Sequence, residues 1–353
     1  MGNKKISKDK KVAFITGITG QDGSYLVELL LEKNYSIHGL IRRNSSSDGT
    51  ERIKKLQNYS SIKLHYGDIT DFGSLASIIK EIMPDEIYNL ASQSHVKVSY
   101  SNSLYTADAN GMGTLRILEI IRLLGLENHT RFYQASTSEM YGEVQPIAQK
   151  ENSEFHPISP YGVSKLYAHW ITKNYRRNFN IFASTGILFN HESPRRGETF
   201  VTRKITKALA ELKNGIKKSP LELGNIEAKR DWGHAKDYVK AMWLILQQEN
   251  PNDFVISTGE VHSVREFIEI ACKFIGFNII WEGEGIDEIG IDANDGRVLI
   301  KINKDFYRPS EVDLLFGDSS LAKKKLGWRY EYSFKDLVEE MCLYDLKNSK
   351  KNN

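Results

Sequence analysis

The feature that most constrains the fold of this chain is a glycine-rich turn at residues 17–23. It places Gly17, Gly20 and Gly23 in the spacing G-x-x-G-x-x-G, directly after the β-branched and aromatic run 12–15 and before the helix-like run 25–31. Glycines in this context permit a tight turn and a close approach of the backbone, so a pyrophosphate can rest on the helix N-terminus. The turn therefore predicts a dinucleotide-binding βαβ unit.

The rest of the N-terminal half repeats this pattern of short apolar runs and longer amphipathic segments. Such alternation is typical of βαβ units around a parallel sheet. Six runs are candidate strands: 12–15, 37–41, 63–66, 86–90, 131–135 and 183–188. The alternation weakens after about residue 190. We therefore expect an α/β fold, a doubly wound Rossmann-type parallel sheet with a smaller C-terminal substrate-binding lobe, and ligands outside the carboxyl ends of the strands.

Composition excludes several other classes of protein. The hydrophobic fraction of 40% and the charged fraction of 26% are ordinary for a globular protein, and a net charge of +3 does not indicate nucleic-acid binding. Cys272 and Cys342 form no Cys-x-x-Cys pair, and His95, His191 and His234 lack zinc-like spacing, so neither a disulfide framework nor a metal site is expected. No apolar run reaches the roughly 20 residues that span a bilayer, so we expect a cytoplasmic protein without membrane contact.

The residues after the second run bear on the choice of dinucleotide. An NAD site usually has an acidic residue about 20 positions after the glycines, where this chain has Arg42 and Arg43. Two guanidinium groups suit a 2′-phosphate, so the sequence favours NADP; the alternative is two surface arginines. Asp68, after the third run, is placed to accept a hydrogen bond from the adenine amino group, and its alternative role is a helix N-cap.

A Tyr-x-x-x-Lys pattern provides the candidate catalytic pair. On a helix, Tyr161 and Lys165 lie on one face, and the fifth run ends nearby in the polar segment 136–139. Tyr59 and Lys63 match the same pattern but lack such a setting, so we interpret them as a chance match. A tyrosine acts as a base only if its pKa falls from about 10 toward about 7. The Lys165 ammonium is expected to supply an effect of about that size, helped by the positive nicotinamide of the oxidised cofactor. The alternative is an ordinary solvent-facing pair.

Taken together, these motifs resemble the extended short-chain dehydrogenase/reductases and, within them, the GDP-mannose 4,6-dehydratase family. The resemblance covers nearly the whole chain. It is carried by residues 17–25, 64–68, 132–139, 187–204, 230–238 and 307–311. The segment Thr137-Ser138-Glu139 has the form of that family, whereas related dehydratases of dTDP-glucose carry Thr-Asp-Glu.

The resemblance implies a lyase that converts GDP-D-mannose to GDP-4-keto-6-deoxy-D-mannose with NADP. Tyr161, assisted by Lys165, would take the proton of the sugar O4 while C4 gives up hydride, and Thr137 would hydrogen-bond O4. Glu139 would remove the C5 proton and pass it to the departing C6 hydroxyl. Residues 11–190 would be the NADP-binding Rossmann domain and 191–345 mainly the GDP-sugar lobe, with flexible tails at 1–10 and 346–353.

The same resemblance, carried over residue by residue, implies two sets of binding residues. The cofactor set is Gly17, Thr19, Gly20, Gln21, Asp22, Gly23, Arg42, Arg43, Asn44, Ser45, Asp68, Ile69, Leu90, Ala91, Ser92, Gln93, Ser94, Tyr105, Lys165, His191 and Arg196. The GDP-sugar set is Ser94, Asn190, Thr202, Lys204, Arg230, Arg308 and Glu311. A homodimer or homotetramer is also implied, with dimer contacts through helices beside the active site.

Two departures from the family pattern leave alternatives open. Ile158 stands where arginine is common, and Ala91-Ser92 replaces Gly-Ala. Both are expected near the sugar, so a GDP-manno-heptose dehydratase is the first alternative. A 4-epimerase or 4-ketoreductase would need no base at C5, so Glu139 argues against it. A non-catalytic NADP sensor would typically lack both Glu139 and the Tyr161–Lys165 pair.

Overall fold

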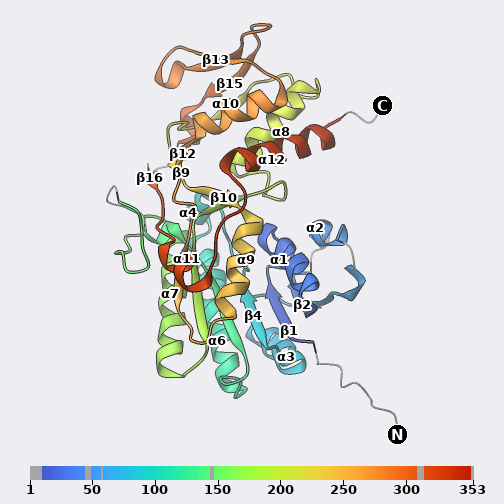
Figure 1. Cartoon of the computed structure of the whole chain (residues 1–353), viewed down its shortest axis with the longest axis vertical. Helices are drawn as coiled ribbons and strands as arrows, with labels where there is room; N and C mark the ends of the chain where they lie inside the picture. The colour runs from blue at the N-terminus through green and yellow to red at the C-terminus, as the bar shows by residue number, and fades with distance from the viewer. Residues whose placement is uncertain (1–9, 44–48, 57–58, 144–146, 308–313, 351–353) are drawn as a thin grey trace.

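The computed structural model describes residues 10–43, 49–56, 59–143, 147–307 and 314–350. Two lobes lie one above the other (Figure 1): a lower lobe with a large sheet between helices, and a smaller upper lobe that contains β13, β15, α8, α10 and α12. Within the described ranges, no helix combines the length and the apolar character that crossing a membrane requires.

The lower lobe is built on one seven-stranded parallel sheet. Its order is β11-β6-β5-β4-β1-β2-β3, so the strand order reverses beside β1. All six predicted strands are confirmed. The strands are β1 (Val12–Thr16), β2 (Ser36–Ile41), β3 (Lys63–Tyr66), β4 (Glu86–Asn89), β5 (Arg131–Thr137), β6 (Ala183–Leu188) and β11 (Asp253–Ile256). Ligands of such sheets bind beyond the carboxyl ends of the strands, at the point where the order reverses.

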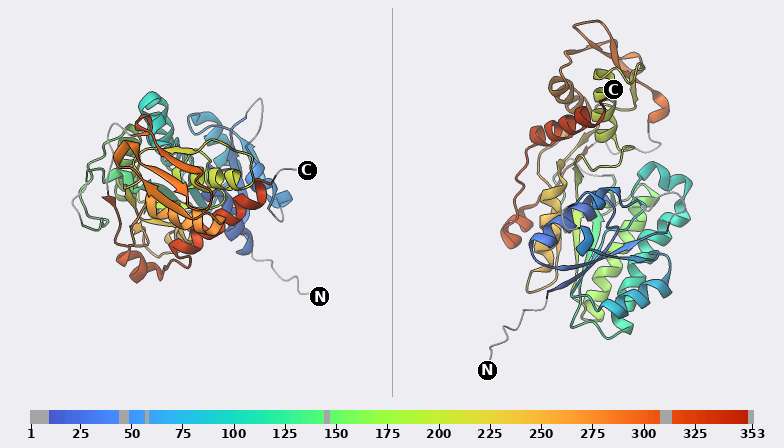
Figure 2. Two further views of the ribbon diagram at one scale, coloured as in Figure 1. Left: turned by 90° about the horizontal axis from the view of Figure 1, so that it is seen from above. Right: turned by 90° about the vertical axis from the view of Figure 1, so that its right-hand side faces the viewer.

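Helices cover both faces of this sheet, as Figure 2 shows from the side. One face packs against α1 (Gln21–Glu32), α9 (Ala235–Leu246) and α11 (Ser320–Leu326), which share an apolar core with Trp328. The other face packs against α3 (Phe72–Ile82), α6 (Gly113–Leu123) and α7 (Pro160–Asn178). Shorter elements complete the lobe: α2 (Glu51–Lys54), η1 (Tyr59–Ser61), α4 (Val96–Ser101), α5 (Ser103–Ala107), the π-helical η2 (Asp108–Met112) and η3 (Ser138–Met140).

The upper lobe has an apolar core of its own, formed by three helices and a four-stranded sheet. The helices are α8 (Val201–Lys213), α10 (Val264–Ile275) and α12 (Phe334–Asn348), and the strands are β13 (Ile279–Glu282), β14 (Ile289–Asp292), β15 (Val298–Ile302) and β8 (Leu221–Leu223). Between the lobes lie the short helix η5 (Lys304–Phe306) and two small sheets: β7 (Asn190–Glu192) with β10 (Trp232–His234), and β12 (His262–Ser263) with β9 (Lys229–Arg230) and β16 (Leu314–Leu315). The short helix η4 (Gly285–Asp287) contacts β15 in the upper lobe.

Helix α7 begins where its sequence predicts. The Ser159 hydroxyl accepts a hydrogen bond from the Gly162 N–H at 3.0 Å, and Pro160 occupies the first helical position, where no N–H is needed. Tyr161 therefore lies in the first turn of α7, one turn before Lys165. Tyr59 lies in η1 and Lys63 in β3, so these two residues share no helix face, and their interpretation as a chance match is confirmed.

The chain returns to the lower lobe after residue 190, which the sequence did not predict. Strand β11 pairs with β6 at the edge of the large sheet, and α9 packs on α1. Both were assigned by sequence to the C-terminal lobe, because the alternation of apolar runs and amphipathic segments weakens after about residue 190. The functional division at residue 190 stays a prediction, but the large sheet extends beyond it.

Candidate active site

A cavity of about 640 Å³ lies at the carboxyl ends of the strands, between the two lobes. It brings together residues that are far apart in the sequence. Of the predicted set, the residues that line it are Gly17, Thr19, Gly20, Gln21, Asp22, Gly23, Arg42, Ile69, Leu90, Ala91, Ser92, Gln93, Ser94, Tyr105, Thr137, Glu139, Tyr161, Lys165, Asn190, His191, Arg196, Lys204 and Arg230.

Three predicted residues are described but do not line the cavity. Arg43 is exposed beside it. The Asp68 carboxylate accepts hydrogen bonds from the Thr70 N–H at 2.9 Å and the Thr70 hydroxyl at 2.8 Å, so it closes a local turn, while Asp71 is the N-cap of α3. Thr202 is buried. Asn44, Ser45, Arg308 and Glu311 lie outside the described residues.

The glycine turn packs directly against the end of β4. Gly17 has a φ of +71°, and a Cβ added there would lie 2.8 Å from the backbone of Leu90 and Ala91. A Cβ on Gly23 would lie 2.4 Å from the Gly17 carbonyl oxygen. Gly20 is the N-cap of α1 and offers no side-chain cap, so the first N–H groups of α1 remain available to an anion at the cavity wall. This cradle suits the pyrophosphate of a dinucleotide.

The proposed catalytic residues meet at one point of the cavity. Thr137 ends β5 and caps η3, where its hydroxyl accepts a hydrogen bond from the Glu139 N–H at 3.2 Å. Thr137, Glu139 and Tyr161 all line the cavity. Burial raises the pKa of Tyr161 most, and the nearby Thr137 hydroxyl lowers it while the Glu139 carboxylate raises it. Threonine hydroxyl, carboxylate and phenol are therefore adjacent.

Tyr161 and Lys165 are both buried in the cavity wall. Burial is the largest effect on both groups: it raises the pKa of Tyr161 to about 12 and lowers the pKa of Lys165 to about 8. The Lys165 ammonium donates to the Ala135 carbonyl oxygen at 2.9 Å and lies 5.9 Å from the centre of the Tyr161 ring. The lowering of the Tyr161 pKa that we expect from Lys165 and the oxidised nicotinamide together therefore has to overcome this burial, and it stays a prediction.

A buried carboxylate that the sequence analysis missed organises the opposite wall. Glu192, 2% exposed, accepts a hydrogen bond from the Thr202 hydroxyl at 2.6 Å and forms an ion pair with Arg196 at 3.1 Å. The Arg196 guanidinium also stacks on the Phe200 ring, with its carbon 3.7 Å from the ring centre. Thr202 thus supports the wall without lining the cavity.

Two further lining residues, Lys97 and Phe306, were not predicted from the sequence. Lys97 and Lys204 both approach the Phe306 ring, at 5.7 and 4.1 Å from its centre. Lys97 lies eight positions after the end of β4. The rule that ligands bind beyond the strand ends would have found Lys97 if more residues after each strand had been considered. Phe306 ends the short helix η5, which follows no strand of the large sheet, so no such signal was present for it in the sequence. Of the two departures from the family pattern, Ala91-Ser92 lines the cavity and Ile158 does not.

A Rossmann sheet, a Tyr161–Lys165 pair on one helix and an upper lobe over the strand ends define an extended short-chain dehydrogenase/reductase. Solved structures agree on the fold: dTDP-glucose 4,6-dehydratase from Streptomyces venezuelae superposes with a TM-score of 0.80 at 21% identity, covering 96% of this chain and 97% of that one. RMD from Pseudomonas aeruginosa has a TM-score of 0.74 at 20% identity, covering 96% and 100%.

Residues 14–341 match the family described as GDP-mannose 4,6 dehydratase, and this chain belongs to that family. The human GDP-mannose 4,6 dehydratase is 54% identical over 352 residues, which cover 98% of this chain and 94% of the human protein. The GDP-mannose 4,6-dehydratase of Vibrio cholerae serotype O1 is 53% identical over 356 residues, covering 97% and 95%.

Substitution of Gly17 tests the cradle. Gly17→Ala should abolish detectable NADPH binding and lower the free energy of unfolding by more than the roughly 1–2 kcal/mol of left-handed strain, because its methyl group would overlap the end of β4. Gly125→Ala is the matched control, since Gly125 has a φ of +67° and no atom within 4 Å of an added Cβ. NADPH fluorescence titration and urea unfolding measure both effects. Equal losses in the two variants would contradict the packing argument.

Proposed function

We propose that this chain is an NADP-dependent GDP-mannose 4,6-dehydratase, a lyase that converts GDP-D-mannose to GDP-4-keto-6-deoxy-D-mannose. The observation that carries the proposal is the presence of the Glu139 carboxylate beside Thr137 and Tyr161 in one cavity. A 4-epimerase or 4-ketoreductase needs no base at C5, whereas water elimination across C5 and C6 does. Relatives at 53–54% identity bear the same name over nearly the full length.

The proposed chemistry divides between these side chains. When bound, the nicotinamide cofactor supplies the acceptor for the C4 hydride and later returns a hydride at C6. Tyr161 receives the O4 proton, and Thr137 holds O4 in place. The new C4 ketone acidifies the C5 proton, which Glu139 removes and delivers to the C6 hydroxyl, so that water leaves. A proton must then return to C5 as hydride adds at C6, and the proton that O4 gave up balances this step. Lys165, with a pKa of about 8, still carries its charge at pH 7 and stabilises the ionised phenol.

Removal of the proposed C5 base should separate the two halves of the reaction. Glu139→Gln should lower the rate of water loss from GDP-mannose by about 10² to 10⁴, because no general base remains at C5. Oxidation at C4 should persist, so reduced cofactor should accumulate on the enzyme. Mass spectrometry of the sugar nucleotide and NADPH fluorescence report the two halves.

Glu143→Gln is the matched control for this experiment. Glu143 is an exposed carboxylate four residues further along, outside the cavity lining, so its variant should behave as wild type. Intact dehydration by Glu139→Gln would overturn the proposed mechanism. Loss of water from GDP-manno-heptose alone, in parallel wild-type incubations, would move the assignment to that substrate.

The preference for NADP over NAD is the finer part of the cofactor proposal. Arg42 lines the cavity, and its guanidinium donates to the Tyr105 hydroxyl at 2.9 Å, which fixes it at the cavity edge. A guanidinium there suits a 2′-phosphate, which NAD lacks. Arg42 therefore carries this proposal, with Arg43 as a weaker contributor.

Replacement of Arg42 should change the selectivity between the two cofactors. Arg42→Ala should weaken NADPH binding by about tenfold or more and leave NADH binding within about twofold, since only NADPH loses a charged hydrogen bond. Arg43→Ala is the comparison and should have the smaller effect. Fluorescence titrations with both cofactors decide the matter. Equal weakening of NADPH and NADH would show that Arg42 does not read the 2′-phosphate.

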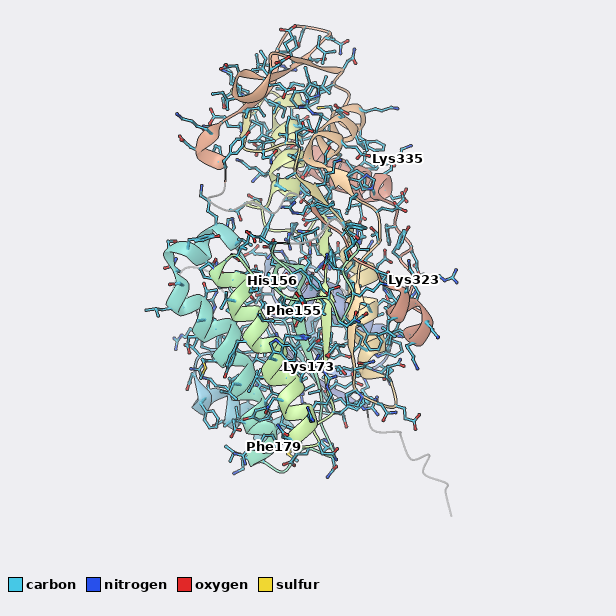
Figure 3. All side chains as sticks on the ribbon, turned by 90° about the vertical axis from the view of Figure 1, so that its left-hand side faces the viewer. Phe155, His156, Lys173, Phe179, Lys323 and Lys335 are labelled. Atoms are coloured by element: carbon cyan, nitrogen blue, oxygen red, sulfur yellow. The ribbon has the colours of Figure 1, made fainter. Side chains whose placement is uncertain are left out.

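We also propose that the chain forms a homodimer, or a homotetramer that contains this dimer, through α7 and the neighbouring α5 and η2. Figure 3 looks onto this side, with Lys173 on α7 and Phe179 at its end. Large side chains that lie on it are exposed: Leu104 87%, Met112 41%, Val163 55%, Tyr167 42% and Trp170 52%. A contiguous exposed apolar surface of this kind is typical of an interface. Because a second copy presents the same helices, a two-fold contact buries both surfaces.

A charge placed on this surface should dissociate the dimer. Trp170→Glu should shift the mass in size-exclusion chromatography with light scattering to that of a monomer, because a buried unpaired carboxylate is costly. Ile280→Glu, a substitution at the similarly exposed Ile280 of β13 in the upper lobe, should keep the wild-type mass. A wild-type monomer, or dissociation by both substitutions, would contradict an interface at α7.

A further inference from the structure

Two ion pairs join α1 to the segment that follows β6, one inside the cavity and one outside it. Inside, the His191 Nε2 lies 2.9 Å from the Asp22 carboxylate. Outside, Arg195 donates to Glu28 at 2.6 and 3.0 Å, and neither residue lines the cavity. Both pairs hold α1 to the same segment, but only the first lies beside the glycine cradle.

The hydrogen bonds of His191 define its protonation state. Its Nδ1 lies 2.7 Å from the Phe189 carbonyl oxygen, and its Nε2 faces the Asp22 carboxylate. A carbonyl and an ionised carboxylate can only accept hydrogen bonds, so both ring nitrogens must carry hydrogen. His191 is therefore an imidazolium, buried against the ring of Tyr238 with 4.4 Å between the ring centres.

The Asp22 carboxylate is held just as firmly. Its second oxygen accepts from the Gln21 side chain at 3.0 Å, and the same Gln21 nitrogen donates to the His191 carbonyl oxygen at 3.0 Å. The Gln21 oxygen in turn accepts from the Ser193 hydroxyl at 2.8 Å. Neither member of the ion pair can turn away without breaking this network.

The position of Asp22 creates an electrostatic problem for an anionic ligand. Asp22 lies in the first turn of α1, whose uncapped N–H groups form the cradle for a diphosphate. A carboxylate at a helix N-terminus is stabilised by the helix dipole, but it also repels a second anion at that terminus. The adjacent imidazolium removes the net charge of the pair.

We propose that His191 is the charge-balancing partner of Asp22, and that this neutral pair allows the N-terminus of α1 to hold the anionic diphosphate of the cofactor. The inference rests on the proposed cofactor function and deepens it. His191 acts here through Asp22, as a positioning residue whose charge matters.

The charged neighbours determine how this arrangement responds to pH. Burial lowers the pKa of His191, but the charge and hydrogen bond of Asp22 and the Phe189 carbonyl together raise it above its ordinary value of 6.5, against the opposing charge of Arg196. Glu192 lies next to His191 on β7, and Tyr238 of α9 faces its ring. Lys165 and Tyr161 of α7 lie within electrostatic reach of Asp22.

The sign of the pH effect follows from this raised pKa. As the pH rises through the pKa of His191, the imidazolium loses its proton and the Asp22 charge is no longer balanced. Affinity for the anionic cofactor should then fall, on the alkaline side of 6.5. Below the pKa of His191 the pair is neutral, and affinity should not change with pH as long as Asp22 stays ionised. Burial raises the pKa of Asp22, but the ion pair with His191 contributes to a net lowering below its ordinary value.

The test measures NADPH dissociation constants by fluorescence from about pH 6 to about pH 9 for the wild type, His191→Gln, Asp22→Asn and the double variant. His191→Gln leaves an unbalanced carboxylate, so binding at neutral pH should be about tenfold weaker and nearly independent of pH. Asp22→Asn removes the carboxylate that needs balancing, so its affinity should vary little with pH over this range. The double variant should regain most of the affinity that His191→Gln loses.

Glu28→Gln is the matched control, because it breaks an ion pair between the same two segments outside the cavity. It should keep the wild-type affinity and pH profile. If the His191–Asp22 pair only ties α1 in place, Glu28→Gln should weaken NADPH binding as much as His191→Gln does. In that case the His191→Gln, Asp22→Asn double variant should also bind no better than His191→Gln alone. Either result would overturn the inference. A wild-type protein that does not bind NADPH at all would instead refute the proposed cofactor.

Discussion

The close contact between the glycine turn and the end of β4 is the constraint on which the rest of the site depends. Gly17 leaves no room for a side chain against Leu90 and Ala91, so the first turn of α1 is drawn over the carboxyl edge of the sheet. The same contact places the backbone of residues 90–94 along the cavity wall. Because α1 starts there without a side-chain cap, its N-terminus faces the cavity.

Strand β7 carries this arrangement into the upper lobe. Neighbouring residues of β7 serve different partners: His191 binds Asp22 of α1, and Glu192 binds Thr202 of α8 and Arg196. A three-residue strand thus joins the wall formed by the glycine turn to the wall formed by α8. The proposed catalytic group of Thr137, Glu139 and Tyr161 lies between these walls, on elements that are fixed by the sheet and by α7.

Much of this was predictable from the sequence, because the informative patterns are local. The glycine turn, the six strand runs and the Ser159-Pro160 start of α7 each depend on neighbours in the chain, and the cavity brings together most residues that the motifs indicated. Strand β11 and Phe306 were missed because their roles depend on contacts with distant segments. The burial that raises the pKa of Tyr161 cannot be read from a Tyr-x-x-x-Lys spacing. The roles assigned to the individual site residues stay predictions.

The route of the chain between the two lobes limits how such a protein can change. After β7 the chain enters the upper lobe, returns to the sheet with α9 and β11, leaves again for α10, comes back with α11 and ends in α12. Each lobe is therefore completed by segments that pass through the other. An upper lobe cannot be exchanged as a block by recombination at one boundary. A new sugar specificity must instead arise from substitutions within the shared cavity, where each also faces the packing of both lobes.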